Sequence, residues 1–227
     1  MAVAGGPNIV EDGLVLALDA ANEKSYPGSG TVWSDLTANE YSGSLYNDPY
    51  YIGDNGGAVY FDGTNDYALI DVPGLSSETT ITVEMWANWR SGTNGMFFGF
   101  NIYDIYSFSG HLGFNNANAN VIGISATEVD TLGLLGNYHH YVFIMNKTGL
   151  LTENKLYIDG DSKTLAAHHG LDGNCRSFSN SIKLNGWLTS TGYNLPLNYG
   201  TFKVYNRELS TSEVLQNYNA TKGRFGL

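Results

Sequence analysis

The chain has 227 residues, of which 42% are hydrophobic and only 15% are charged. This length is ordinary for one all-β sandwich, and the hydrophobic fraction is large enough for a folded core. Acidic residues outnumber basic ones by 22 to 11, so the net charge is −11 at pH 7. Proteins that bind phosphate backbones or anionic lipid surfaces need positive charge. We therefore expect neither a nucleic acid nor a membrane as a partner.

The composition favours β-structure, because 16 Tyr and 10 Phe suit pleated surfaces and 28 Gly suit tight turns. Residues 1–12 contain small residues and Pro7, and they are expected to form an N-terminal arm. A continuous apolar strand is predicted at residues 13–19. Residues 20–43 show no sustained periodicity and are predicted to be mostly loop.

The clearest strand pattern lies at residues 81–89, where Ile81, Val83 and Met85 alternate with polar residues. Further short strands, rich in aromatic or β-branched residues, are predicted at residues 58–61, 67–70, 95–100, 102–108, 120–125, 138–145, 155–158, 181–187 and 201–205. Many short strands separated by turn residues predict an all-β fold, an antiparallel two-sheet jelly-roll sandwich over residues 13–209.

One helix is predicted, within residues 210–227. Ser210 and Glu213 have the spacing of a capping box, in which each side chain accepts a hydrogen bond from the backbone of the other. The apolar residues that follow at helical spacing are Val214, Leu215 and Tyr218. Because short isolated helices are marginal in water, we expect this helix to pack on the sandwich of its own subunit, with a tail beyond Gly223.

Several segments, taken in order, resemble the laminin G-like, concanavalin A-like jelly-roll family; they are residues 13–20, 59–67, 80–86, 156–160 and 202–213. The Tyr-Pro-Gly-Ser-Gly loop at residues 26–30 and the ending at residues 215–225 resemble a narrower subset, found in virion proteins of tailed phages, notably marine and cyanobacterial phages. The resemblance implies a concanavalin A-like sandwich. It does not specify a function, because enzymes, lectins and structural modules share this fold.

Enzymatic activity is not expected, because paired carboxylates are missing. Glucanases of this family carry Glu-x-Asp-x-x-Glu on a concave strand, where the two carboxylates act as nucleophile and acid. The nearest segment here begins with Glu128 and Asp130, but Gly133 stands where the second Glu is needed. Glu84 has no companion carboxylate two or four residues away. We therefore predict no glycoside hydrolase activity.

Calcium binding is implied by the family resemblance, since several relatives hold a structural Ca²⁺ in loops that correspond here to Asp19, Asp35, Asp62 and Asp66. These residues are also ordinary turn formers, and no dense array of alternating carboxylates is present. The adjacent pairs His139-His140 and His168-His169 would point to opposite faces of a strand, which suits no shared metal. We therefore favour the absence of a cofactor, with a structural Ca²⁺ as the alternative.

Glycan binding would use aromatic rings beside Asn and Asp side chains on loops or on the concave sheet. The candidate rings are Trp86, Trp187, Tyr193 and Tyr199. Most aromatic residues of a sandwich belong to its core. The Gly, Thr and Ser residues between positions 187 and 193 make this segment the best candidate for an exposed loop.

Two functions follow as hypotheses. The first is a non-enzymatic structural protein of the phage virion, such as a capsid decoration, fibre or tail accessory, that assembles in the host cytoplasm. The lone Cys175 and the lack of a signal-like segment at residues 1–7 fit that compartment. The second is a carbohydrate-binding adhesion module that recognises glycans of the host surface.

The C-terminal tail is the expected assembly contact in the first hypothesis. It combines basic and apolar residues in an acidic chain, which suits the acidic surface of another virion protein or of a second copy in a homo-oligomer. The residues concerned are Lys222, Arg224, Phe225 and Leu227.

Overall fold

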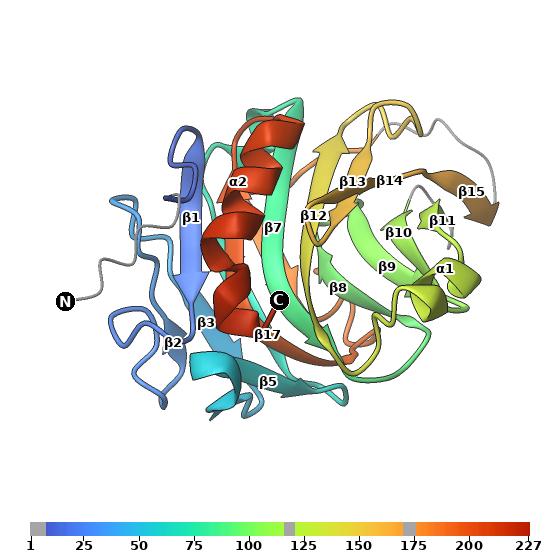
Figure 1. Ribbon diagram of the computed structural model, residues 1–227. Helices are drawn as coiled ribbons and strands as arrows, with labels where there is room; N and C mark the ends of the chain where they lie inside the picture. Colours follow the sequence, from blue (N-terminus) through green and yellow to red (C-terminus); the bar gives the residue numbers. More distant parts are fainter. Residues whose placement is uncertain (1–7, 116–120, 170–175) are drawn as a thin grey trace.

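The computed structural model describes residues 8–115, 121–169 and 176–227, and its strands form two antiparallel sheets that pack face to face (Figure 1). Successive side chains of a strand point to opposite faces, so the apolar face of each sheet is buried against the other. Val83 and Met85 of β7 (Thr80–Trp89) show this, since both are fully buried in the core. Residues 1–7 of the predicted arm and Cys175 lie outside the described residues.

The first sheet, sheet A, has eight strands in the described part of the chain. In spatial order they are β14 (Asp161–Lys163), β13 (Lys155–Ile158), β12 (Tyr138–Asn146), β7, β17 (Pro196–Tyr205), β5 (Ala58–Asp62) and β4 (Tyr50–Ile52), with β1 (Leu14–Asp19) also paired to β17. Sheet B has nine described strands: β15 (Ala166–His169), β11 (Val121–Ile124), β10 (His111–Asn115), β9 (Asp104–Phe108), β8 (Gly95–Gly99), β16 (Ser181–Leu184), β6 (Tyr67–Asp71), β3 (Gly43–Tyr46) and β2 (Val32–Trp33).

Two α-helices and three short 3₁₀ helices accompany the described strands. They are α1 (Ala126–Thr131), α2 (Thr211–Thr221), η1 (Asp54–Gly56), η2 (Leu75–Ser77) and η3 (Lys222–Phe225). Among the described residues, no helix has the length and apolar character needed to span a membrane.

The predicted fold class is confirmed: the chain is an all-β jelly-roll sandwich with one short C-terminal helix. The structure differs from the predicted elements in detail. The expected loop at residues 20–43 contains β2, and β17 begins at Pro196 rather than at residue 201. The strands β3, β4, β10, β14 and β15 and the helix α1 were not predicted. These segments are short or interrupted by Gly and polar residues, so neighbouring strands supply the pairing that their own pattern does not indicate.

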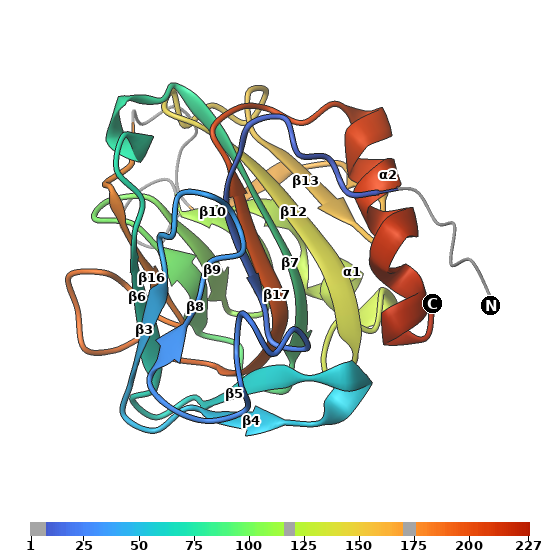
Figure 2. The same ribbon diagram turned by 90° about the vertical axis from the view of Figure 1, so that its left-hand side faces the viewer.

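Helix α2 covers the outer face of sheet A (Figures 1 and 2). The capping box is present: Ser210 Oγ accepts from the amide of Glu213 at 3.3 Å, and Glu213 Oε2 accepts from the amide of Ser210 at 2.8 Å. Val214 is buried as expected, but Leu215 is 46% exposed. The residue that faces the sheet at the next turn is the polar Asn217, which is fully buried.

Asn217 completes a buried polar group, here named the Glu84 cluster, with three side chains of sheet A: Glu84, Lys203 and His140. Glu84 is fully buried, with Lys203 Nζ at 2.7 Å and His140 Nε2 at 3.3 Å. Asn217 Nδ2 donates to the other carboxylate oxygen at 2.5 Å. Burial opposes ionisation, but Lys203 and His140 outweigh it and hold the pKa of Glu84 well below its usual range. The helix therefore closes over an ionised carboxylate.

Replacing Glu84→Gln should lower the free energy of unfolding by about 3 kcal/mol, because Lys203 then lies buried without a counter-charge. Urea unfolding at pH 7 measures the change. The matched control is Glu208→Gln, which breaks the exposed Lys155–Glu208 pair and should cost less than about 1 kcal/mol. Equal losses in the two variants would contradict the structural role of the cluster.

The same cluster should make stability depend on pH. The folded-state pKa of Glu84 lies below its ordinary value of 4.5, so its stabilisation is complete above that pH and is lost as the pH falls further. The difference in stability between the unmodified chain and the Glu84→Gln variant should therefore be largest near neutral pH and shrink as the solution is acidified. A difference that stays constant on acidification would show that Glu84 is not ionised in the fold.

Candidate functional site

The loop at residues 185–195 follows β16 and lies on the outer face of sheet B, projecting beside β6 and β16 in Figure 2. Two asparagines hold its base. Asn185 Nδ2 and Asn194 Nδ2 each donate to the carbonyl oxygen of Asp66 at 3.0 Å, and Asn194 Nδ2 also donates to the carbonyl of Asn185 at 2.6 Å. Asn185 Oδ1 accepts from the amide of Leu195 at 2.9 Å. These buried and partly buried bonds fix where the loop leaves and rejoins the sandwich.

Aromatic rings gather on one side of this loop. Trp187 and Tyr193 meet edge to face with ring centroids 6.0 Å apart, and Tyr193 lies 5.9 Å from the ring of Tyr106 on β9. Trp187 Nε1 donates to the carbonyl of Asn101 at 2.9 Å, which fixes the indole. Tyr193 is 43% exposed, and its φ of 68° places it in the left-handed region. A bulky residue held there costs about 1–2 kcal/mol, and such strain concentrates at functional sites.

A hollow of about 530 Å³ lies on the other side of the same loop and is here named the Lys183 pocket. Its lining consists of Asn47, Asn65, Tyr67, Leu69, Lys183, Leu188, Thr189, Ser190, Thr191 and Asn194. Lys183 Nζ donates to the carbonyl of Ser190 at 2.8 Å and lies 4.4 Å from the centroid of the Tyr67 ring. Amides, hydroxyls and an aromatic ring therefore surround one ammonium group.

The structure brings together two of the four predicted glycan-binding residues, Trp187 and Tyr193. The other two, Trp86 and Tyr199, are fully buried and present no ring to a ligand. Tyr199 lies between the sheets, where its hydroxyl donates to the carbonyl of Phe97. Trp86 is on the outer face of sheet A, where the C-terminal segment covers it.

Sequence reasoning missed Lys183, Tyr67, Asn47 and Asn194. One signal in the sequence could have indicated the first of them: Lys183 interrupts an otherwise apolar strand, between Ile182 and Leu184.

The four aspartates proposed as calcium ligands stabilise their own loops. Asp19 Oδ1 accepts from Arg224 at 2.6 Å and from the amide of Ala21 at 2.9 Å. Asp35 accepts four hydrogen bonds from the backbone or side chains of Ala17, Thr37 and Tyr41.

Asp62 and Asp66 share one turn, in which Asp66 Oδ2 accepts from the amide of Asp62 at 3.0 Å. Within the described ranges, no three His, Cys, Asp or Glu side chains gather as a metal ion would require. These residues do not fit the calcium ion that the family implies.

The histidine pairs differ from each other. His139 bonds to Asp159 at 2.6 Å, whereas His140 belongs to the Glu84 cluster, so this pair faces opposite ways as predicted. In β15 an irregular pairing with β11 turns both rings of the second pair toward His111, with centroids at 4.2 Å for His168 and 5.2 Å for His169. The expectation of opposite faces is wrong for this second pair.

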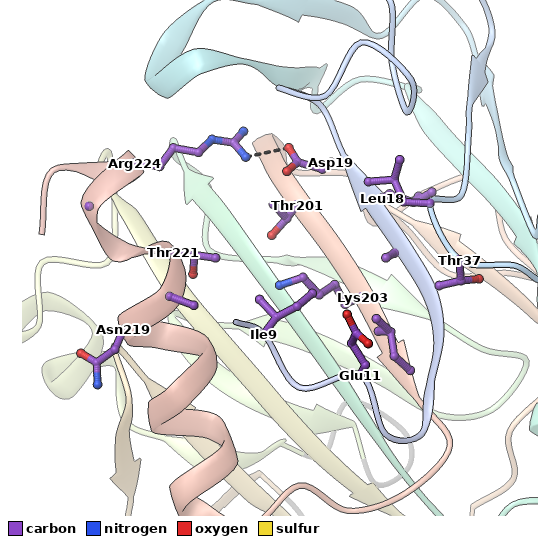
Figure 3. A pocket seen from close by; sticks show the side chains of 15 residues that line it. Ile9, Glu11, Leu18, Asp19, Thr37, Thr201, Lys203, Asn219, Thr221 and Arg224 are labelled. Atoms are coloured by element: carbon purple, nitrogen blue, oxygen red, sulfur yellow. Dashed lines mark hydrogen bonds and ion pairs between the residues drawn. The ribbon is translucent and has the colours of Figure 1, made fainter. Parts of the chain in front are cut away.

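The predicted assembly tail binds its own sandwich. Arg224 crosses one end of a hollow of about 630 Å³ between α2 and β1, where its Nη1 lies 2.6 Å from Asp19 Oδ1 (Figure 3). Its other nitrogens donate to the carbonyls of Asn55 at 2.8 Å and Gly57 at 2.7 Å. The guanidinium is therefore fully engaged within the chain.

Phe225 stacks on Trp86 with the ring centroids 4.2 Å apart and is only 7% exposed. Gly200 makes room for this ring, because a Cβ at that position would lie 2.8 Å from it. Lys222 lies over the ring of Tyr218 at 5.1 Å. The expectation that the tail docks on a neighbour does not hold for Arg224 and Phe225, since a close apolar and acidic surface exists on the same chain. Leu227 remains 52% exposed.

The near-match to a glucanase motif is not on a sheet. Glu128 and Asp130 lie on α1, whose N-terminus is capped by Ser125 Oγ accepting from the amide of Glu128 at 3.1 Å. Glu84 is fully buried beneath α2. In the described structure, neither position places a carboxylate in the Lys183 pocket.

Comparison with known proteins gives a family and a fold. A laminin G-type family model, described as the concanavalin A-like lectin/glucanases superfamily, matches residues 61–215. No curated protein matches the chain. Among solved structures, the receptor binding domain of botulinum neurotoxin C/D mosaic serotype superposes with a TM-score of 0.63 and 14% identity, over 92% of this chain and 51% of that one. A Trypanosoma rangeli sialidase in complex with the inhibitor DANA has a TM-score of 0.64 and 14% identity, over 99% of this chain and 35% of that one. This chain thus spans about half of the first structure and about a third of the second.

Replacing Phe225→Ala should lower the free energy of unfolding by about 3 kcal/mol, because it removes the ring that fills the space between Trp86 and Gly200. Chemical denaturation provides the measurement. Leu227→Ala, which truncates an exposed side chain of the same tail, is the control and should change stability by less than about 0.5 kcal/mol. An unchanged Phe225→Ala variant would mean that the tail is not held by the sandwich.

Removing divalent cations should barely affect stability, because the candidate aspartates are already satisfied by protein donors. We expect EDTA to shift the melting temperature by less than ~5 °C, equivalent to about 1–2 kcal/mol. A larger fall that added Ca²⁺ reverses would contradict this expectation and restore the calcium site.

Proposed function

This chain belongs to the concanavalin A-like lectin/glucanases superfamily, and we propose that it is a non-enzymatic carbohydrate-binding protein. Its ligand lies on the outer face of sheet B, at the 185–195 loop. The observation that carries this proposal is the joint placement of the exposed Tyr193 and the Lys183 pocket on the two sides of one firmly held loop.

The chemistry of this loop suits a sugar. Each hydroxyl of a sugar both donates and accepts hydrogen bonds, and the pocket offers amides at Asn47 and Asn194 and hydroxyls at Thr189 and Thr191. The apolar face of a sugar ring needs an exposed aromatic ring, which Tyr193 supplies. The fold is lectin-like, and similar structures include a toxin receptor binding domain and a sialidase solved with sialic acid. These likenesses support binding as the activity.

The absence of catalysis is part of the proposal. Retaining glycosidases need two carboxyl groups about 5–5.5 Å apart beside the scissile bond. The described lining of the Lys183 pocket contains no carboxylate at all. Glu84, Glu128 and Asp130 occupy other parts of the fold. A glycan bound at this loop therefore meets no acid and nucleophile pair.

We further propose that the protein is a component of a tailed-phage particle, where sugar binding would serve adhesion to the host surface. The supporting observation is the sequence resemblance at residues 26–30 and 215–225. Of the tail residues proposed for assembly, Leu227 is still available for contact with another virion protein or a second copy. Mass spectrometry of purified particles should detect the chain at a fixed ratio to a capsid protein. Its absence from intact particles would contradict a virion role.

Sugar binding should be lost when the aromatic side of the loop is removed. On a glycan array the unmodified chain should bind a defined set of glycans with millimolar to micromolar affinity, and Tyr193→Ala or Trp187→Ala should weaken binding roughly tenfold, as expected for a lost aromatic contact of about 1.4 kcal/mol. Tyr50→Ala removes a tyrosine that is 55% exposed on sheet A and is the control. The bound glycan should be recovered intact. Equal binding by all variants, or cleavage of the glycan, would contradict the proposal.

A further inference from the structure

Lys183 is a buried cation without an ionic partner in the described structure. The residue is 5% exposed, and its Nζ donates to a neutral group, the carbonyl of Ser190. None of the ion pairs among the described residues includes it. Burial lowers its pKa, and no neighbouring carboxylate raises it again. A buried charge is ordinarily paired, so this ammonium group has an unmet need for a negative partner.

The surroundings of Lys183 keep acidic groups away. The whole chain carries 22 acidic residues against 11 basic ones, yet the described lining of the pocket includes none of the acids. Asp66 is close by in the fold, since its carbonyl accepts from Asn194, but its carboxylate turns to the amide of Asp62. The net charge repels anions at long range, but at physiological salt that repulsion is screened beyond about 8 Å. Inside the pocket, the nearby positive charge of Lys183 determines whether an anion is attracted.

The ammonium group has donors to spare. An Nζ carries three hydrogens, and Ser190 takes one of them. The ring of Tyr67, 4.4 Å below, stabilises the charge without occupying a donor direction as a carboxylate would. Lys183 lines the open hollow together with Thr189 and Thr191, whose hydroxyls can also donate to an anion.

We propose that the Lys183 pocket selects acidic sugars, with the carboxylate or sulfate group of the sugar accepting hydrogen bonds from Lys183 Nζ. This inference rests on the proposed function, because it names the class of glycan that the same loop binds. The neutral hydroxyls of the sugar bond to the amides and hydroxyls of the pocket, and Tyr193 contacts the chain of sugars on the other side of the loop. Affinity therefore depends on the anionic substituent as well as on the ring.

The test compares oligosaccharides that differ only in charge. Binding is measured by calorimetry at physiological salt with an oligogalacturonate, with the same oligosaccharide after reduction of its carboxylates to alcohols, and with a sulfated galactan oligosaccharide of similar length. The variants are Lys183→Gln, which removes the charge, and Lys183→Arg, which keeps it. Lys163→Gln, on the edge strand β14 of sheet A, makes the same change in net charge elsewhere. Thermal unfolding checks that each variant is folded.

We expect an acidic oligosaccharide to bind at least tenfold more tightly than the reduced one, a preference that Lys183→Gln abolishes and that Lys183→Arg and Lys163→Gln retain. Whether the carboxylated or the sulfated sugar binds more tightly identifies the anion. Equal binding of charged and reduced sugars, or a loss in Lys183→Gln that is the same for both, would overturn charge selection while leaving sugar binding intact. Binding of none of the three sugars, in a folded protein that also binds nothing on a glycan array, would overturn the proposed function itself.

Discussion

The buried ion pair between Lys203 and Glu84 is the contact on which the outer face of sheet A depends. Two charges on a sheet surface cannot remain in a low-dielectric environment unless their other hydrogen-bonding positions are filled. Asn217 of α2 donates to the second carboxylate oxygen of Glu84, and the ring of His140 on β12 lies 3.3 Å from the first, so the helix contributes directly to holding the buried carboxylate. A buried pair of this kind adds little net stability compared with an apolar core, but breaking it is costly, and it therefore specifies where the helix lies.

The closure of sheet A determines where function can be. Helix α2 and the tail cover the outer face of that sheet, and two basic groups that line the hollow beside them, Lys203 and Arg224, are each paired with a carboxylate. The outer face of sheet B carries no comparable helix in the described structure (Figure 2). Two buried lysines differ in their surroundings. Lys203 has a carboxylate 2.7 Å away, whereas Lys183 faces a hollow whose other lining groups are neutral. The first is structural, and the second is free to serve a ligand.

The C-terminal tail contacts its own sandwich, although its chemistry would also suit the surface of a neighbouring subunit. Its basic and apolar residues do seek an acidic and apolar partner, as complementarity requires. That partner lies within the same chain: Asp19 takes Arg224, and Trp86 takes Phe225. A partner within reach on the same chain has a high effective concentration, which favours this contact over one with a neighbouring subunit of similar chemistry. Leu227, at the end of the tail, remains exposed to solvent.

The sequence by itself determined the fold class, the position and cap of the C-terminal helix, and the lack of a catalytic carboxylate motif. These are local properties: alternation along β7, the spacing of Ser210 and Glu213, and the glycine at position 133 are all read within a few residues. The placement of Trp187 and Tyr193 on one loop could be predicted for the same reason, since small polar residues lie between them. Only the tertiary structure decided that Trp86 is buried, that Arg224 is paired with Asp19, and that Lys183 has no ionic partner among the described residues. Burial and charge pairing depend on residues far apart in the chain, such as Trp86 with Phe225, and no local pattern records which of them will meet.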